Sequence, residues 1–401
     1  MGKIDELIQQ YCPDGVEYKT LGEVCEFRAG WGFPEVEQGL AEGKYPFYKV
    51  GDMNNSEMFM DTANNYISEE TSKKLKCKPA PKGTIIFPKI GATMNTNKKR
   101  ILTKQSCYDN NVMGLIAKSV NDRFLYYFFS QYNLIDFAKG TGAVPSLDTN
   151  RLKALPIPLP PLPVQEAIVN ILDRFAVYAA ELQAELQARQ QQYNYYRDTL
   201  LSFDGREDVQ WKKLGEVCIY AKERIGADLM NENNYVSVEN LLPNQRGKEK
   251  ASNVPKEGNC IKFEPNDVLI GNIRPYLHKI WYADCVGGTN GDVLCIRIKD
   301  DAKNVIIPRY LYCILSSHSF FEYDNSYSKG AKMPRGDKQK VMEYEFGIPT
   351  KSEQQRIVEI LDRFDTLVND LSQGLPAEIE ARRQQYEYYR DKLLTFKRKE
   401  E

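Results

Sequence analysis

Two long stretches of the chain carry apolar or long side chains at alternating steps of four and three residues. In the first stretch these positions are Ile168, Leu172, Phe175, Ala179, Leu182, Leu186, Arg189, Tyr193, Tyr196, Leu200 and Phe203. In the second they are Ile357, Leu361, Phe364, Val368, Leu371, Leu375, Ile379, Arg382, Tyr386, Tyr389, Leu393 and Phe396. Such spacing over about five heptads is typical of coiled coils, so it predicts two long helices. Two four-residue steps adjoin at Leu375, between Gly374 and Pro376, which predicts a bend or break in the second helix there.

A heptad seam needs a partner, because leucine and phenylalanine are unfavourable when exposed to water. The simplest partner for each helix is the other one, and the long segment between them allows an antiparallel pair. Dimerisation through the seam, or packing of one apolar face on a domain core, are the alternatives. The seam residues expected to make the contact are Leu172, Phe175, Leu182, Leu186, Tyr193, Tyr196, Leu361, Phe364, Leu371, Tyr386 and Tyr389.

The rest of the chain contains short β-type runs between clusters of glycine, proline and asparagine, a pattern that predicts strands. Proline-containing segments precede both long helices, and they predict hinges because proline fixes φ and ends regular structure. The predicted strands are Thr84–Phe87, Val112–Ile116, Val268–Ile270 and Val293–Ile298. Short aromatic helices are predicted at Arg123–Phe137 and Arg309–Tyr323, and the hinges at Leu155–Pro163 and Gly347–Pro349.

The second half of the chain repeats the first. Leu21–Cys25 returns as Leu214–Cys218, and Gln191–Asp198 returns as Gln384–Asp391 with one substitution, Glu387 in the place of Asn194. A period this long indicates the duplication of a whole domain rather than a solenoid repeat. We therefore predict an α+β fold of two duplicated mixed α/β domains, joined by two long antiparallel coiled-coil helices about a pseudo-twofold axis. The predicted limits are 1–160 and 205–350 for the two domains, and 161–204 and 351–401 for the two helices.

Composition sets limits on the class of protein. A chain of 401 residues with 42% hydrophobic residues can form two or three domains with real cores. It has no apolar run of membrane-spanning length, and Met1–Gln10 has no signal-peptide pattern, so we expect a cytoplasmic protein without membrane contact. The nine cysteines form no Cys-x-x-Cys pair and are expected to be reduced. The net charge of -1 argues weakly against nucleic-acid binding, although binding depends on where the charges lie.

Residues for most enzyme chemistry are scarce. The two histidines, His278 and His318, have no second ligand at metal-binding spacing. Neither a Gly-x-Ser-x-Gly nucleophile elbow nor a Gly-x-x-x-x-Gly-Lys phosphate loop occurs. Asp14 and the Glu17–Lys19 segment resemble a metal-dependent nuclease motif, but they lie too close together to surround one metal ion, which favours a turn. We therefore expect no catalytic residue, no metal and no cofactor.

Two basic stretches, Lys89–Lys104 and Ser328–Lys340, lie in loops inside the duplicated domains. Lysine and arginine can neutralise phosphates, and asparagine and arginine can form paired hydrogen bonds with base edges. The alternative is a solvated face with turn-forming polar residues. The candidate DNA-binding residues of the first half are Lys89, Thr93, Asn95, Asn97, Lys98, Lys99, Arg100, Asn110 and Asn111. Those of the second half are Asn272, Arg274, Tyr276, Lys279, Thr289, Asn290, Lys329, Lys332 and Arg335.

The whole chain resembles the specificity subunits of type I restriction-modification systems, in which two target-recognition domains are each followed by a long helix. The resemblance is carried by Leu155–Leu162 leading into Gln165, by Ile171–Phe175, by Tyr193–Leu201, and by the doubled Ala180–Gln183 and Ala184–Gln187. It implies that each domain reads one half of a bipartite sequence in double-stranded DNA while the helices set the spacer. It also implies that two methyltransferase subunits, which bind S-adenosylmethionine, and restriction motor-nuclease subunits assemble with the chain.

Two other classes of function stay open at this point. A self-sufficient nuclease or methyltransferase would need the catalytic motifs that the chain lacks. A non-catalytic coiled-coil adaptor that pairs two protein-binding domains would need only the seam and the duplication.

Overall fold

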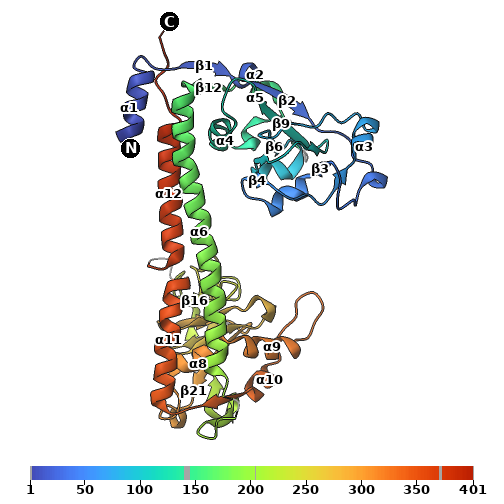
Figure 1. Cartoon of the computed structure of the whole chain (residues 1–401). Coiled ribbons are helices and arrows are strands. Elements are labelled where there is room, and N and C mark those ends of the chain that lie inside the picture. The colour runs from blue at the N-terminus through green and yellow to red at the C-terminus, as the bar shows by residue number, and fades with distance from the viewer. Residues whose placement is uncertain (1, 140–144, 204, 370–372, 401) are drawn as a thin grey trace. The chain divides into compact units, whose positions relative to one another are not determined.

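The computed structural model describes residues 2–139, 145–203, 205–369 and 373–400, and the chain forms two compact units. Unit 1 holds residues 1–180 with 381–401, and unit 2 holds residues 181–380 (Figure 1). Each unit contains one of the duplicated domains together with parts of both helical stretches. The division therefore passes through the helices rather than between helix and domain.

Unit 1 is built around a five-stranded sheet with the order β2-β9-β6-β7-β4. The predicted strands Thr84–Phe87 and Val112–Ile116 correspond to its central strands β6 and β9, whose side chains are buried because α4 covers one face of the sheet. The strands of the unit are β1 Glu17–Thr20, β2 Cys25–Ala29, β3 Tyr45–Tyr48, β4 Phe59–Met60, β5 Tyr66–Ile67, β6 Ile85–Pro88, β7 Arg100–Leu102, β8 Cys107–Tyr108, β9 Val112–Ala117, β10 Ala138–Lys139, β11 Ser146–Leu147 and β12 Pro156–Leu159. Its shorter helices are α1 Gly2–Tyr11, α2 Leu21–Val24, η1 Glu35–Glu37, η2 Val50–Asn55, α3 Glu69–Lys74, η3 Gly91–Thr96, α4 Asp122–Ser130, η4 Leu134–Phe137 and α5 Thr149–Lys153.

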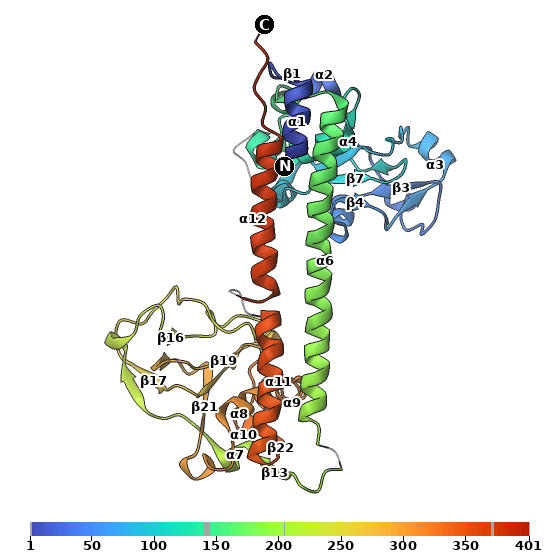
Figure 2. The same ribbon diagram turned by 60° about the vertical axis from the view of Figure 1, so that its left-hand side comes forward.

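Unit 2 repeats this plan around a four-stranded sheet with the order β14-β21-β18-β19. Strands β19 and β21 of this sheet are labelled in Figure 2. The predicted strands Val268–Ile270 and Val293–Ile298 correspond to its central strands β18 and β21. The strands of the unit are β13 Gln210–Lys213, β14 Cys218–Tyr220, β15 Arg224–Gly226, β16 Tyr235–Val236, β17 Asn259–Phe263, β18 Val268–Gly271, β19 Ile280–Tyr282, β20 Gly287–Thr289, β21 Val293–Ile298 and β22 Glu345–Ile348. Its shorter helices are α7 Leu214–Val217, η5 Ala227–Leu229, η6 Pro275–Leu277, η7 Asp300–Ala302, α8 Pro308–Leu315, α9 His318–Ser326 and α10 Lys338–Glu343.

Strand register shows which residues of the two units correspond. Ile85 of β6 pairs with Leu115 of β9, and Val268 of β18 pairs with Ile296 of β21 in the same antiparallel way. Each unit also contains one parallel pair outside the central sheet, β3 with β8 and β16 with β20. The predicted duplication is thus a duplication of structure.

The proline-rich segment before the first long helix is a strand, so the prediction of a hinge there was wrong. Pro156–Leu159 forms β12, which pairs antiparallel with β1 and places Pro156 opposite Thr20 and Pro158 opposite Tyr18. A two-stranded ladder tolerates proline at alternate positions, because every second N–H points away from the partner strand. The second predicted hinge behaves alike, since β22 (Glu345–Ile348) pairs with β13.

The two predicted aromatic helices are each interrupted. In unit 1 the α-helix ends at Ser130, and Leu134–Phe137 forms a separate 3-10 helix. In unit 2 the break falls at Ser316 and Ser317, where the Ser317 hydroxyl accepts a hydrogen bond from the backbone N–H of Phe320 and caps α9. Serine at this position therefore starts a new helix instead of continuing the old one.

The predicted coiled coil is present as α6 (Leu162–Leu201), α11 (Lys351–Asn369) and α12 (Leu375–Leu393). In unit 1 the Phe175 ring of α6 contacts Tyr386 and Tyr389 of α12, at 6.3 and 5.6 Å between centroids. In unit 2 Tyr193 and Tyr196 contact Phe364 of α11, at 6.5 and 5.4 Å. Early residues of one stretch therefore meet late residues of the other, as an antiparallel pair requires.

The other seam residues follow the same pattern. Leu172, Leu182 and Leu361 are buried, and Leu186 is partly buried against the core of unit 2. Leu371 lies outside the described residues. A new helix begins at Leu375, next to the predicted break at Gly374 and Pro376.

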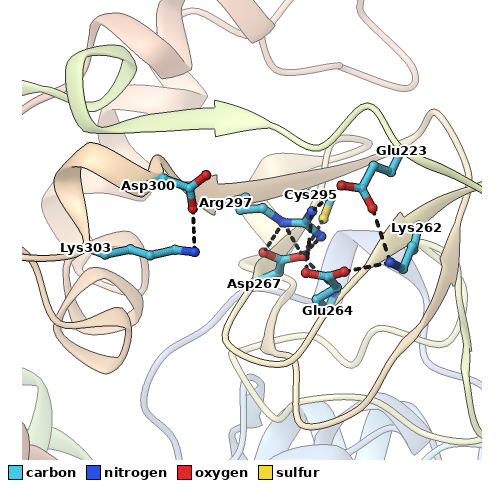
Figure 3. Close-up of polar contacts among 8 residues, drawn as sticks. All are labelled: Glu223, Lys262, Glu264, Asp267, Cys295, Arg297, Asp300 and Lys303. Carbon is cyan, nitrogen blue, oxygen red and sulfur yellow. Dashed lines mark hydrogen bonds and ion pairs between the residues drawn. The ribbon is translucent and has the colours of Figure 1, made fainter.

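An ion-pair network around one buried carboxylate, Asp267, links the sheets of unit 2 (Figure 3). Arg297 of β21 donates two hydrogen bonds to the Asp267 carboxylate, from Nε at 2.9 Å and Nη2 at 2.7 Å, and the Asp267 side chain is only 4% exposed. Glu223 and Glu264 lie 3.6 and 3.7 Å from the same guanidinium. The hydrogen bonds that Arg297 donates to Asp267 raise the pKa of Arg297, so the guanidinium stays charged.

No helix in the described part of the chain has the length and apolar character that crossing a bilayer requires. Eight of the nine cysteines are buried thiols and Cys285 is half-buried. Burial raises the pKa of most of these thiols, including Cys25 and Cys218 to about 12, which keeps them in the unreactive protonated form.

Candidate nucleic-acid interface

In unit 1 the candidate loop follows β6 and turns at Asn97. Asn97 has the left-handed φ of 51°, and its Oδ1 accepts hydrogen bonds from the Leu134 backbone N–H at 2.9 Å and from Lys99 Nζ at 2.8 Å. Its amide also donates to Asn133 Oδ1 at 2.9 Å. Asn97 therefore ties the loop to η4, and its side chain is occupied by contacts within the protein.

Lys99 points inward. The residue is 4% exposed, and its ammonium group donates to the Tyr132 carbonyl at 2.8 Å and lies 4.9 Å from the Phe129 ring centroid. Burial, together with the charge of Arg390, lowers the pKa of Lys99 to about 7. With its ammonium group held inside the domain, Lys99 supports the loop through the Tyr132 carbonyl, and a contact with DNA stays a prediction.

The remaining candidates of unit 1 divide into anchored and exposed residues. Arg100 donates to the carbonyls of Ser56 and Lys99, and Lys98 bonds the Asn54 side chain. The Thr93 hydroxyl donates to the carbonyl of Ile90, and Lys89 is half-buried, which lowers its pKa. Exposed side chains belong to Asn95, Asn110 and Asn111.

In unit 2 the structure brings two separate candidate segments together. Ile273 forms a β-bridge with Arg335, and the Arg274 N–H donates to the Pro334 carbonyl at 2.7 Å. Lys329 and Arg335 pair reciprocally through two 2.9 Å backbone hydrogen bonds, which closes a hairpin. The side chains of Arg274, Tyr276, Lys329, Lys332 and Arg335 are exposed on this loop cluster.

Other candidates of unit 2 are held inside it. Thr289 is fully buried and its hydroxyl donates to the Val236 carbonyl, while Asn272 is 5% exposed. Lys279 is half-buried, and its ammonium group bonds the Val238 carbonyl. Asn290 is half-buried and its Oδ1 accepts from the Asp292 backbone N–H. As placed here, these four residues contribute to the scaffold of the loops.

The loop cluster has the same backbone frame in unit 1. There Ile90 bridges to Ser146, and the Gly91 N–H donates to the Pro145 carbonyl at 2.7 Å. In this bridge Ser146 of unit 1 occupies the position that Arg335 occupies in unit 2. Residues 140–144 lie outside the described residues.

Pro145 and Pro334 were not among the predicted site residues, although the sequence contained a signal for them. In the sequence, Lys139-Gly140 and Lys329-Gly330 precede the two prolines, and Asp148 and Asp337 each follow three residues after them. Each aspartate caps the next helix by accepting from backbone N–H groups, Asp148 from Asn150 and Arg151, and Asp337 from Gln339 and Lys340. Matching these short motifs would have located the frame.

A second missed feature joins each domain to its helix through a buried glutamine. Gln165 accepts from the Asn121 N–H at 2.9 Å and donates to the Pro160 carbonyl at 2.8 Å. Gln354 makes the equivalent bonds with Ile307 and Pro349 at the same two distances. These bonds use both ends of each amide, so they hold the start of each long helix against its domain.

Ion pairs reinforce the same junction in both units. Arg123 of α4 pairs with Asp173 of α6 at 2.5 Å, and Arg309 of α8 pairs with Asp362 of α11 at 2.7 Å. The domain is therefore oriented by its helix through matched polar contacts.

A buried carboxylate lies beneath the loop cluster of unit 2. Asp324 is 2% exposed, and among the described residues neither of its oxygens has a hydrogen-bond partner. A Cβ at Gly336 would lie 2.5 Å from Asp324 Oδ1 and 2.8 Å from Asn272 Oδ1, so glycine is required there. Burial raises the pKa of Asp324 to about 6.

Asp324→Asn is expected to stabilise unit 2 at high pH. The folded pKa is raised, so the folded chain binds the proton more tightly, and stability falls as pH rises from about 4 through about 6. The variant should gain about 1–3 kcal/mol in unfolding free energy near pH 8 and little near pH 4. Thermal unfolding at both pH values measures this, with the exposed Asp301→Asn as control. A loss of stability near pH 8 would contradict it.

Comparison with known proteins places this geometry in a family. The family model for the type I restriction modification DNA specificity domain matches residues 13–189 and 206–381. The chain is 32% identical to the type I restriction enzyme EcoR124I/EcoR124II specificity subunit of Escherichia coli, over 74% of each chain. It is 31% identical to a putative type I restriction enzyme specificity subunit of Haemophilus influenzae, over 95% of this chain and 96% of the relative.

Solved structures agree at the level of the fold. The type I restriction-modification S subunit from M. genitalium superposes with a TM-score of 0.54 at 16% identity, covering 95% of this chain and 96% of that chain. A chain from a structural study of complex assembly of the type I R-M system gives 0.59, also at 16% identity, covering 95% and 98%. The chain therefore belongs to the family of type I restriction-modification specificity subunits, the non-catalytic members of these complexes.

Proposed function

We propose that the chain reads a bipartite sequence in double-stranded DNA, with the loop cluster of each unit contacting one half-site. The observation that carries this proposal is the shared frame. Gly91 with Pro145 and Arg274 with Pro334 make the same backbone bond at 2.7 Å, yet the side chains on the two frames differ. A common scaffold with different exposed side chains suits the reading of two different half-sites.

The exposed charge of unit 2 supports contact with the DNA backbone. Lys329, Lys332 and Arg335 lie on one hairpin, where they can neutralise phosphates. Asp337 and Asp292 pair with Lys329 and Arg335, at 2.9 and 3.1 Å, and orient them. Such exposed pairs are weak and exchange readily for phosphate partners.

Two methyltransferase subunits are proposed to dock on the helices. Tyr195 of α6 and Tyr388 of α12 occupy the same place in the repeated motif, and they are 66% and 62% exposed. Large exposed tyrosines are frequent anchors of protein interfaces. Two equivalent anchors suit two copies of one partner. S-adenosylmethionine would bind to those partners rather than to this chain, and motor-nuclease subunits would join the assembly for restriction in the cytoplasm.

Single-molecule methylation mapping tests the proposal. DNA from cells making this chain with its methyltransferase subunit should carry N6-methyladenine in both halves of one gapped motif, and DNA from cells lacking the chain should not. The absence of such a motif, with the methyltransferase active beside another specificity subunit, would contradict DNA recognition and favour the coiled-coil adaptor.

Methylation mapping, together with a DNA-binding titration of the assembled complex, tests the hairpin of unit 2. Replacing Lys329, Lys332 and Arg335 by alanine removes three positive charges, so affinity should fall at least ~10-fold and lose part of its salt dependence. The methylated fraction should drop at every occurrence of the motif. Lys351→Ala, which removes one exposed charge at the start of α11, is the control. An unchanged affinity of the assembled complex would remove the hairpin from the interface.

A further inference from the structure

Unit 2 contains a polar cavity of about 730 Å³ beside helix α6. All ten residues that line it are polar or charged. The α6 helix contributes Asn194 and Arg197, the loop before β17 contributes Gln245 and Arg246, and His278 and His318 complete the wall. A lining without apolar side chains does not suit the apolar ligands that most pockets bind.

Arg197 is held in place at this cavity. The side chain is 3% exposed, its Nη1 donates to Gln245 Oε1 at 2.8 Å, and its guanidinium lies 5.3 Å from the Tyr193 ring centroid. Asp198, the one acidic residue of the lining, is 3.4 Å from Arg197 Nε. A buried guanidinium whose orientation is already fixed loses little further conformational freedom when an anion binds.

Two histidines line the same cavity as the arginines. His278 stacks on Phe321 with 4.5 Å between ring centroids, which fixes its orientation. Burial, and the charges of His318 and Arg197, lower the pKa of His278. The neighbouring cations therefore act on His278 across the same cavity, and an anion placed there would relieve their repulsion.

The backbone around the cavity adopts an uncommon conformation. Asn244, Gln245 and His278 have φ values of 57°, 62° and 49°, in the left-handed region that favours glycine. Two backbone hydrogen bonds of 2.9 Å, from Asn244 to Leu277 and from Gln245 to His278, hold the loops together. Non-glycine residues in this region are unfavourable, and they cluster where a protein positions groups around a ligand.

At the position in unit 1 that corresponds to this cavity, the protein has a buried lysine, Lys99. By strand register, Asn97 corresponds to His278 and Lys99 to Ile280, and Arg390 repeats Arg197 in the duplicated motif. Lys99 is buried there and bonds the Tyr132 carbonyl. In unit 2 the apolar Ile280 replaces this lysine, and the neighbouring space is lined by polar groups instead.

We infer that the cavity of unit 2 is a phosphate-binding site, with Arg197 and Arg246 as charged ligands and Gln245 and His278 as hydrogen-bonding partners. His318 also lines the cavity, while its Nε2 pairs with Glu322 Oε1 at 3.0 Å. Guanidinium groups match the geometry of phosphate oxygens, and amide and imidazole N–H groups complete the coordination. The phosphate can come from the free ion or from a DNA backbone, because both present the same oxygens. The site does not depend on sequence recognition and is separate from the exposed loop cluster.

Histidine NMR provides a direct probe, because the only two histidines of the chain both line the cavity. The full-length chain is labelled at histidine, and its two imidazole signals are followed while inorganic phosphate replaces chloride at constant ionic strength. A second titration uses a short DNA duplex. Both signals are expected to shift and saturate with phosphate.

Matched variants separate binding from folding. Arg197→Gln removes the buried ligand, and Arg246→Gln removes an exposed one that can be replaced without disturbing the core. Each should weaken phosphate binding at least ~10-fold. Arg390→Gln, the same change at the repeated position of unit 1, should leave binding unchanged.

The outcomes are distinct. Saturating shifts that Arg246→Gln weakens and Arg390→Gln preserves support the site, and shifts with the duplex alone assign it to a DNA phosphate. Imidazole signals that are the same in chloride and in phosphate, or that shift with neither inorganic phosphate nor the duplex, would overturn the phosphate site. A chain that shows these shifts but directs no methylation would leave the phosphate site standing while the proposed function fails.

Discussion

Replacing Arg297 by alanine is expected to lower the unfolding free energy of unit 2 by about 3–5 kcal/mol, because it leaves the Asp267 carboxylate buried without its partner. The loss includes both hydrogen bonds, at 2.9 and 2.7 Å, and the carboxylate side chain is only 4% exposed, so water cannot replace them (Figure 3). Urea unfolding followed by tryptophan fluorescence measures the change, since Trp281 lies in β19 of the same sheet.

Two controls make this result specific. Lys303→Ala breaks the neighbouring pair with Asp300, whose side chains are 62% and 95% exposed, and should cost only about 0–1 kcal/mol. Unit 1 has Thr84 and Ile116 where unit 2 has Asp267 and Arg297, so the double variant Asp267→Thr, Arg297→Ile copies a pairing that the fold already accepts. It should recover most of the stability lost in Arg297→Ala. A double variant as unstable as the single one would show that the network is not the cause.

Much of the fold followed from the sequence because the same pattern occurred twice. The central strands β6, β9, β18 and β21 contain the β-branched runs that predicted them, and the heptad spacing predicted α6 and its antiparallel contacts with α11 and α12. These elements depend on local periodicity, which a single sequence contains. The proline-rich segment was predicted to be a hinge because proline is excluded from the central strands of a sheet. Proline is not excluded from a two-stranded ladder.

The candidate site was less predictable because burial and long-range pairing decide it. Nothing next to Lys99 in the sequence shows that its ammonium group bonds the Tyr132 carbonyl inside the domain. Likewise, the pairing of Ile273 with Arg335 joins segments that are distant in the chain. Composition of a loop identifies residues that can bind DNA, but only the fold shows which of them are free to do so.

If the chain reads a bipartite site as proposed, deleting Ala184–Gln187 is expected to change the length of the unread spacer by one or two base pairs and to leave both half-sites unaltered. The α6 helix runs without interruption from unit 1 into unit 2. Four residues of helix span ~6 Å, close to two base pairs at ~3.4 Å each, and they turn ~40° beyond a full turn, close to the twist of one base pair. The lost helical rise therefore corresponds to about two base pairs and the lost rotation to about one, which gives the expected range of the change in spacer length.

Methylation mapping of cells that carry the deletion measures the spacer directly. The loop clusters, which are proposed to read the bases, lie outside Ala184–Gln187, so the recognised half-sites should stay the same. Replacing Glu185 and Gln187 by alanine, which keeps the length of the helix and changes only exposed side chains, should leave the spacer unchanged. A deletion that altered a half-site while keeping the spacer would show that α6 shapes the reading loops. A changed spacer with constant half-sites would mean that helix length alone measures the distance between them.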